Sequence, residues 1–292
     1  MDFRQYQEEA LKTDHIPAEN DTQIIVPLLG LAGEAGELLS EYKKYLRDGE
    51  AHKLFPERVA EELGDLLWYI ANLSSKFNLN LEQIAEGNLQ KCRDRWGWRD
   101  LVETGAYIFD RDFPEHERLP RQFVVEITEV SENNSVKMKA FINGEQIGDP
   151  LTDNSYSSDG YRFHDIFHFS YAAVLGWSPV SRSNVKRKRK SNPQIDEVED
   201  GGRAIAIEEG ISALVFSYAN KHNLLEGVET LDYELLKTIK NMTEHLEVAK
   251  CSLGDWEKAI LRGYEVWRQV KKKRGGNVVV NLDKRSIIYQ DN

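Results

Sequence analysis

Two pairs of acidic residues recur at a spacing that could hold a divalent metal ion. Glu34 and Glu37 lie three positions apart in LLGLAGEAGELLSEYKKYL, and Glu62 and Asp65 repeat that spacing in EELGDLLWYI. Residues three apart on a helix are neighbours, so each pair can direct two oxygens to one point. Four close carboxylates would repel one another without a counter-ion, and a hard divalent cation prefers oxygen ligands. The pattern predicts a metal site, the alternative being solvated acids beside a core stripe.

The residues around these acids predict amphipathic helices, because apolar residues recur at the three-and-four spacing of a helical face. In the first segment these residues are Leu28, Leu31, Ala35, Leu38, Leu39, Tyr42 and Tyr45. In the second segment they are Leu63, Leu66, Leu67, Ile70 and Phe77. Glycines stand among the acids at Gly33, Gly36 and Gly64. Since a glycine inside a helix costs about 1 kcal/mol relative to alanine, we expect a close approach of backbone or ligand there.

The first hundred residues read as four helices on short loops, at 3–13, 28–46, 56–77 and 81–96. This pattern predicts an antiparallel four-helix bundle. The fourth helix places Asn88, Lys91 and Arg95 on one face. An amide and two cations in line suit a polyphosphate chain, and a solvated basic face is the alternative.

At this point the residues resemble a known family. GEAGELLSE followed by EELGDLLWYI is similar to the E-x-x-E…E-x-x-D signature of MazG-type nucleoside triphosphate pyrophosphohydrolases, of the all-α NTP pyrophosphatase superfamily. NLQKCRDR is similar to the N-x-x-K-x-x-x-R pattern common in that family. The resemblance covers roughly the first hundred residues. It implies Mg²⁺, or Mn²⁺ as the alternative, held by Glu34, Glu37, Glu62 and Asp65.

The resemblance also implies a reaction: cleavage of a nucleoside triphosphate between the α- and β-phosphates, giving a monophosphate and pyrophosphate. Metal ions neutralise a triphosphate and stabilise charge on the transferred group. A carboxylate outside the metal's inner shell could orient or deprotonate the attacking water, and Glu41 and Glu61 are the candidates. A rival hypothesis is a catalytically weak nucleotide-binding sensor, whose C-terminal half signals to a partner.

The sequence after residue 100 predicts a different pattern of secondary structure. Residues 101–120 read as a linker, and residues 121–292 as a helical domain with small β-hairpins, so the fold class is mainly α. One hairpin is predicted at FVVEITEV and VKMKAFING, and another closes around Leu282-Asp283. IEEGISALVFSYANKHNL resembles AEELGDLLWYIANLSSKFNL, so this half could be a degenerate second copy of the first domain.

Two features of the second half leave alternatives open. The residues His164, Asp165, His168, Glu208 and Glu209 either belong to a non-catalytic copy that completes the first unit or form a distinct metal site. Histidines at i and i+4 on a helix are a known ligand geometry. The basic run 186–190, followed by DEVED, reads as a solvated loop, as local charge pairing, or as a lid over phosphates.

Composition narrows the partners, the cellular setting and the oligomeric state that we expect. The net charge of −11 over 292 residues disfavours nucleic acid as a partner. Two distant cysteines, Cys92 and Cys251, favour a reduced cytoplasmic setting. No apolar run of the roughly 18 residues typical of a membrane span is expected. A small bundle with surplus apolar surface, including Trp68 and Tyr69, predicts a homo-oligomer, a dimer or higher.

Overall fold

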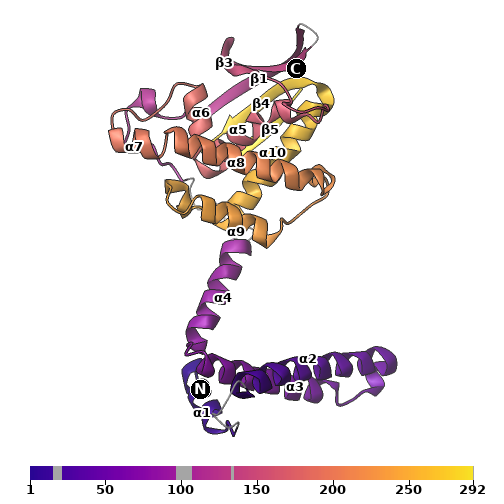
Figure 1. The fold of residues 1–292 in the computed structure, drawn as a ribbon. Helices are drawn as coiled ribbons and strands as arrows, with labels where there is room; N and C mark the ends of the chain where they lie inside the picture. Colours follow the sequence, from indigo (N-terminus) through magenta and orange to yellow (C-terminus); the bar gives the residue numbers. More distant parts are fainter. Residues whose placement is uncertain (16–21, 97–106, 133–134, 292) are drawn as a thin grey trace. The chain divides into compact units, whose positions relative to one another are not determined.

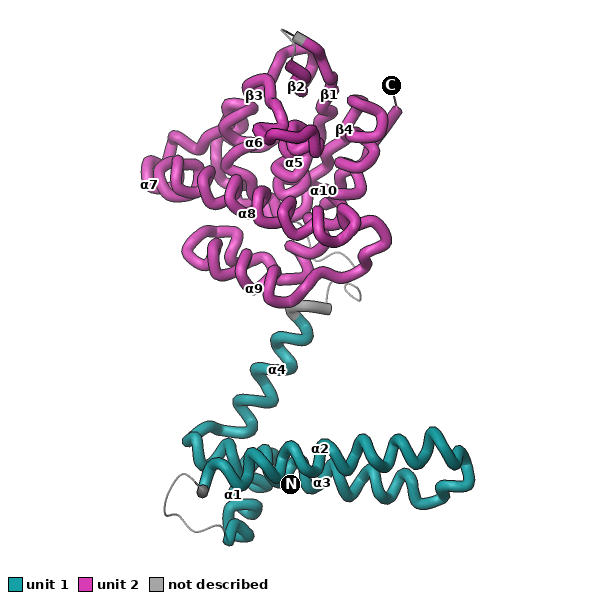
Figure 2. Tube along the Cα trace, turned by 45° about the vertical axis from the view of Figure 1, so that its right-hand side comes forward, with its two compact units in different colours: residues 1–93 teal, residues 94–292 magenta. Residues whose placement is uncertain are grey.

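The structure, a computed structural model, describes residues 1–15, 22–96, 107–132 and 135–291. They form two compact units (Figures 1 and 2), unit 1 being Met1–Arg93 and unit 2 being Asp94–Asn292. Helices predominate in the described residues, and the sheet is small and antiparallel, so the predicted mainly α class is confirmed. Each unit is described by itself below.

The helices of unit 1 confirm the four predicted ones. Their bounds are α1 Phe3–Lys12, α2 Thr22–Asp48, α3 Phe55–Lys76 and α4 Leu81–Trp96, the last turn of α4 belonging to unit 2. Helices α2 and α3 form a long hairpin, and α1 lies against α3 (Figure 1). Asp2 caps α1, because its side chain accepts the backbone N–H of Gln5 while the Gln5 side chain accepts that of Asp2. Pro56 stands in the first turn of α3, where the missing N–H costs nothing.

The predicted core faces of α2 and α3 are largely uncovered within unit 1. Leu39 is 70% exposed and Leu63 is 51% exposed. The buried cluster that the structure describes here is small: Ala10, Ala71 and Leu81, with Tyr6 and Trp68 against it. A hairpin with one short helix beside it offers too few partners to bury both stripes. The predicted burial was therefore wrong for a single chain.

Helix α2 also corrects the expectation that no apolar run approaches membrane length. The helical stretch Gln23–Ala51 is long and apolar enough, by length and composition alone, to cross a membrane. Only 6% of that apolar window is buried in the structure. Length and composition alone do not distinguish a membrane span from a helix that carries Glu34 and Glu37 beside an uncovered apolar stripe. The length and composition of α2 are therefore weak support for a span.

Unit 2 contains one five-stranded antiparallel sheet in the order β3-β2-β1-β4-β5. The strands are β1 Gln122–Glu132, β2 Ser135–Ile142, β3 Glu145–Leu151, β4 Gly275–Asn281 and β5 Ser286–Gln290. Both predicted hairpins are confirmed, as β1–β2 and as β4–β5. Pairing of β1 with β4, which places Ile127 opposite Gly276, joins them into one sheet. Strand β3 was not predicted.

Helices pack on this sheet and on one another. Their bounds are α5 Asp165–Leu175, α6 Pro179–Asn184, α7 Pro193–Val198, α8 Gly202–Asn220, α9 Tyr233–Met242 and α10 Leu253–Lys273. Short 3-10 turns connect elements of both units, at η1 Gly49–Ala51, η3 Glu115–Glu117, η4 Tyr161–Phe163, η5 Asn223–Leu225 and η6 Glu247–Lys250. Helices α5 and α10 contact each other and strands β4 and β5, and α8 contacts α5 (Figure 1). Trp177, Trp256 and Trp267 are fully buried in this core.

The predicted linker and basic run are partly built into unit 2. Residues 97–106 lie outside the described part of the chain, but Asp110 accepts a hydrogen bond of 2.8 Å from Arg182 Nη2. Arg189, the fourth residue of the basic run, is 1% exposed and pairs with Asp200 and Glu247 at 2.7 Å each. The run is therefore not a wholly solvated loop. The predicted charge pairing with the DEVED segment is confirmed at Asp200.

Candidate active site

Three of the four predicted metal ligands converge in the α2–α3 hairpin. Glu34 on α2, and Glu62 and Asp65 on α3, each offer a carboxylate oxygen, and these oxygens all lie within 4.8 Å of one another. Glu37 is outside this group. Burial, a hydrogen bond with Glu34 and the charges of nearby acids raise the pKa of Glu62. Glu37 is one of these acids, with Glu34 and Asp65, so it lies near the group.

The donor set fits a hard divalent cation. Every converging ligand is a carboxylate, the oxygen donor that Mg²⁺ and similar ions prefer. Burial, then a hydrogen bond with Glu34 and the charges of the neighbouring acids, raise the pKa of Glu62, and a bound cation would relieve the repulsion among these acids. Glu34 and Glu62 are half-buried while Asp65 is exposed, so the cluster is open on one side for a substrate.

The glycines among the acids face open space. A Cβ added at Gly33, Gly36 or Gly64 would meet no described atom of the chain within 4 Å. The described residues therefore do not make the close approach that the sequence predicts at these positions. The close approach within the chain is at Gly30, where an added Cβ would stand 2.2 Å from Cζ of Tyr69. That contact helps to set α2 against α3 and therefore sets Glu34 against Glu62.

The two candidate bases lie in different surroundings. Glu41 is buried and accepts hydrogen bonds from Lys44 and from His52 Nε2, the latter at 2.9 Å. These two partners, Lys44 foremost, lower the pKa of Glu41. Glu61 has a side chain that is 55% exposed and pairs with Arg58 Nη1 at 2.7 Å. Glu61 is thus the more accessible to water.

Arg58 is a cation beside the acids that the sequence reading missed. Its hydrogen bond and ion pair with Glu61 raise the pKa of its guanidinium, and Glu41 and Glu62 contribute more weakly. The side chain is exposed, so it can reach a phosphate. Its place four residues before Glu62 on one helix was the available signal, since residues at i and i+4 are neighbours.

The predicted phosphate-binding residues lie on α4. Asn88 and Lys91 are exposed there, and Asn88 Oδ1 lies 3.9 Å from Cys92 Sγ. Arg95 lies in the last turn of α4, but its side chain is outside the described residues. The role of these three residues stays a prediction.

Trp68 and Tyr69, which flank the acids in sequence, serve packing. Trp68 Nε1 donates to Thr13 Oγ1 at 2.7 Å, and the Trp68 and Tyr69 rings meet edge to face at 5.0 Å. Both rings are half-buried and take part in these packing contacts within unit 1.

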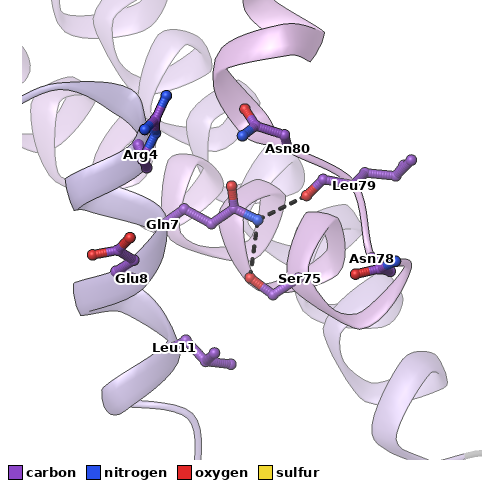
Figure 3. Close-up of a pocket in the computed structure, with 8 residues that line it drawn as sticks. All are labelled: Arg4, Gln7, Glu8, Leu11, Ser75, Asn78, Leu79 and Asn80. Carbon is purple, nitrogen blue, oxygen red and sulfur yellow. Dashed lines mark hydrogen bonds between the residues drawn. The ribbon is translucent and has the colours of Figure 1, made fainter.

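A polar groove of about 520 Å³ lies elsewhere in unit 1, between α1 and the turn from α3 to α4 (Figure 3). Its lining residues are Arg4, Gln7, Glu8, Leu11, Ser75, Asn78, Leu79 and Asn80. Gln7 Nε2 spans it, donating to Ser75 Oγ at 3.1 Å and to the Leu79 carbonyl at 2.9 Å. Ser75 is thirteen residues beyond Glu62 on α3, about 20 Å along the helix. The groove is therefore separate from the acidic cluster.

Comparisons with known proteins agree with this arrangement. Residues 26–99 match the family model of the MazG nucleotide pyrophosphohydrolase domain, and residues 104–292 match that of the MazG C-terminal domain. The Gene 37 protein of Mycobacterium phage L5 is 35% identical over 96 residues, which cover 31% of this chain and 84% of that protein. No solved structure matches. Since the C-terminal match alone spans more than half of the sequence, the chain belongs to the MazG family, and its N-terminal domain makes it a nucleoside triphosphate pyrophosphohydrolase, a hydrolase of phosphoric anhydrides.

Proposed function

We propose that the protein hydrolyses nucleoside triphosphates, with ribose or deoxyribose, to a nucleoside monophosphate and pyrophosphate in a Mg²⁺-dependent reaction. The observation that carries the proposal is the convergence of Glu34, Glu62 and Asp65 within 4.8 Å in a domain of this family. When bound, Mg²⁺ or Mn²⁺ would supply charge neutralisation of the triphosphate. Glu37 adds a fourth negative charge to the same field.

The remaining residues would bind and orient the substrate. The sequence spacing of Asn88, Lys91 and Arg95 puts an amide and two cations at positions along one face of α4, a set that suits phosphate oxygens. Arg58 is a further exposed cation beside the acids. Its guanidinium can donate two parallel hydrogen bonds to one phosphate group. This pair of bonds would fix the orientation of the bound triphosphate.

A carboxylate must also orient the attacking water, and we assign this role to Glu61 ahead of Glu41. Glu61 is accessible and neighbours Glu62 in sequence. Glu41 is buried against Lys44 and His52, which favour its ionised form but also occupy its oxygens. The expected order is that Glu61→Gln lowers turnover more than Glu41→Gln when both variants are folded.

The experiment is a screen of the common ribo- and deoxyribonucleoside triphosphates with Mg²⁺, followed by separation of products. Pyrophosphate and the monophosphate should appear in equal amounts. Orthophosphate with the diphosphate as product, from a preparation free of phosphatase, would contradict the proposal. Tight calorimetric binding with no product would instead favour a nucleotide sensor.

The uncovered apolar faces support a homo-oligomer, with a second copy of the chain on the α2–α3 hairpin. Leu29, Leu39 and Leu46 are among the most exposed large apolar side chains of the described residues. Large apolar side chains left exposed along one helix are typical of an interface in a soluble protein, and a two-fold dimer is the commonest solution. The open space at Gly36 and Gly64 would let a second chain or the nucleotide approach the acids closely.

A further inference from the structure

Two histidines and a glutamate in unit 2 converge on one point. His164 caps the start of α5, His168 follows one turn later, and Glu209 projects from α8, which contacts α5 (Figure 1). One ligand atom from each of these three residues lies within 4.8 Å of the other two. Asp165, which the sequence places beside them, is not part of this group. The group comes from two helices, so it depends on how α5 packs against α8.

Both rings are held by their Nδ1 atoms. The Nδ1 of His164 lies 2.9 Å from the carbonyl oxygen of Tyr161. A carbonyl can only accept, so His164 Nδ1 carries the hydrogen. The ring also stacks on Tyr161 with centroids 4.4 Å apart, which fixes its plane. In the neutral imidazole, the lone pair therefore lies on Nε2, the atom that faces Glu209.

The same assignment holds for His168, through Glu208. His168 Nδ1 lies 2.9 Å from Glu208 Oε1, and this fully buried carboxylate also accepts from Ser178 Oγ at 2.6 Å and from the Val180 amide at 2.8 Å. Both oxygens of Glu208 accept hydrogen bonds, so we infer that His168 Nδ1 donates to Oε1. A carboxylate that orients a ligating histidine in this way is the common partner of a metal-bound imidazole.

In the neutral rings, the form that binds a metal, both Nε2 atoms would be acceptors that face Glu209. His168 Nε2 is fully buried and makes no hydrogen bond among the described residues. It lies 3.5 Å from Glu209 Oε1, and His164 Nε2 lies 3.6 Å from Glu209 Oε2. These separations exceed the 2.7–3.2 Å typical of an N–H···O hydrogen bond. They are close to the roughly 3.4 Å that separates two ligands of a tetrahedral zinc ion bound at about 2.0–2.1 Å.

We propose that His164, His168 and Glu209 bind one divalent transition-metal ion of the zinc class. Two imidazoles and a carboxylate suit zinc, iron or nickel, whereas a magnesium site is built from oxygens. Three protein ligands leave a coordination position open. The Glu209 side chain is 41% exposed, so water or a small anion can reach the site from solvent on that side. The site would be independent of the carboxylates of unit 1.

The experiment measures metal content and coordination in the full-length protein. The variants are Glu209→Gln, His164→Gln and the double change Glu62→Gln with Asp65→Asn, which removes the acidic cluster of unit 1. After dialysis against metal-free buffer, the wild type should retain about one zinc per chain, as tightly bound structural ions do. Replacement by Co²⁺ should give the visible absorption of a four- or five-coordinate site with nitrogen ligands.

His222 supplies the matched control. Its Nδ1 lies 2.7 Å from the Tyr218 carbonyl and its ring stacks on Tyr218, as His164 does on Tyr161, but it belongs to no metal-ligand group of the described residues. His222→Gln and the double variant should keep the zinc and the cobalt spectrum. Glu209→Gln and His164→Gln should weaken zinc binding at least about tenfold, the lower range for disturbed metal sites.

Three outcomes would overturn the inference. The wild type could hold no zinc and give no cobalt spectrum, which would mean that protons alone bridge the rings and Glu209. Zinc could leave with the double variant and stay in Glu209→Gln. His222→Gln could lose as much zinc as His164→Gln, which would indicate unspecific binding to exposed histidines. Circular dichroism on each variant separates loss of metal from loss of fold, and Glu209, being partly exposed, is the substitution least disturbing to the core.

Discussion

Gly30 of α2 lies directly under the ring of Tyr69 on α3. An added Cβ would stand 2.2 Å from Cζ and 2.6 Å from the hydroxyl of Tyr69. Only a glycine lets the two helices approach this closely here. Since the same two helices carry Glu34 and Glu62, this contact sits in the framework of the acidic cluster.

Gly30→Ala should therefore destabilise unit 1 by about 1–3 kcal/mol, the usual cost of overpacking. In a Tyr69→Ala background most of this cost should disappear, because the clashing ring is gone. Gly87→Ala is the control: an added Cβ there meets nothing within 4 Å, so a gain of up to about 1 kcal/mol is expected from helix propensity. Chemical denaturation measures the wild type and the four variants, and equal costs of Gly30→Ala in both backgrounds would contradict the assignment.

Removal of the converging carboxylates should abolish turnover while the fold persists. For Glu62→Gln or Asp65→Asn we expect a fall of more than about 100-fold, because even changes behind a metal's ligands cost 10–100-fold. Glu57→Gln, at an exposed acid in the first turn of the same helix, is the control and should stay near wild type. Pyrophosphate release measures the rate. A variant with normal turnover at either position would remove that residue from the site.

Metal binding should also be visible without substrate. The three carboxylates around Glu62 repel it without a cation, so Mg²⁺ or Mn²⁺ should raise the thermal unfolding midpoint in proportion to the logarithm of its concentration above Kd. The double variant Glu62→Gln with Asp65→Asn should lose this response. An equal response from wild type and double variant would place the binding elsewhere.

Part of this fold and site was predictable because it depends on local pattern. The helices of unit 1 and both hairpins have strong periodicity and clear turn residues, and the paired acids follow from helical spacing alone. Burial was harder to predict. An apolar stripe such as the one with Leu39 and Leu63 does not show whether the same chain or another one covers it. Strand β3, EQIGDPL, has a proline and few apolar residues, so its pattern is weak.

Other features depend on contacts between distant segments. Arg189 lies in a basic run that looks solvated, but Asp200 and Glu247 bury it. The choice between a packing role and a ligand role for His164 and His168 depends on Glu209 being brought across from α8. The spacing of residues in the sequence does not predict the distance between Glu209 and the two histidines. That α8 belongs to a degenerate copy of the domain that contains α3 stays a prediction. In unit 2 this helix packs beside a core that is backed by the sheet.

The ion pair between Asp110 and Arg182 should be a main support of unit 2. Both side chains are 2% exposed, and the oxygens of Asp110 also accept from Arg121 and from the Leu119 amide. Asp110→Asn leaves the buried Arg182 without its partner's charge, so a loss of about 3–5 kcal/mol is expected. Asp112→Asn, at an exposed neighbour, should change stability by less than about 0.5 kcal/mol. Denaturant titration measures both.

The same pair predicts a pH dependence. Burial alone would raise the pKa of Asp110, but Arg182 and Arg121 hold it below its ordinary value. A carboxyl with a lowered folded pKa stabilises the fold above its unfolded pKa of about 3.9 and loses that contribution as the pH falls toward the folded value. The unfolding free energy of the wild type should therefore fall below about pH 4, and Asp110→Asn should flatten that fall. An unchanged slope in the variant would show that other carboxyls dominate acid unfolding.

The last prediction concerns assembly on the α2–α3 hairpin. Light scattering after size exclusion should give a mass at least twice the 33.6 kDa of one chain. Leu39→Gln combined with Leu46→Gln should lower that mass, because both side chains are about 70% exposed in one chain and would be buried in an interface. Lys43→Gln, an exposed polar position on the same helix, should leave the mass unchanged. A fragment of residues 1–100 should aggregate or oligomerise by the same faces. If that fragment were monomeric and fully active, neither a second copy nor unit 2 would be needed to complete the site, and the exposed leucines would need another explanation.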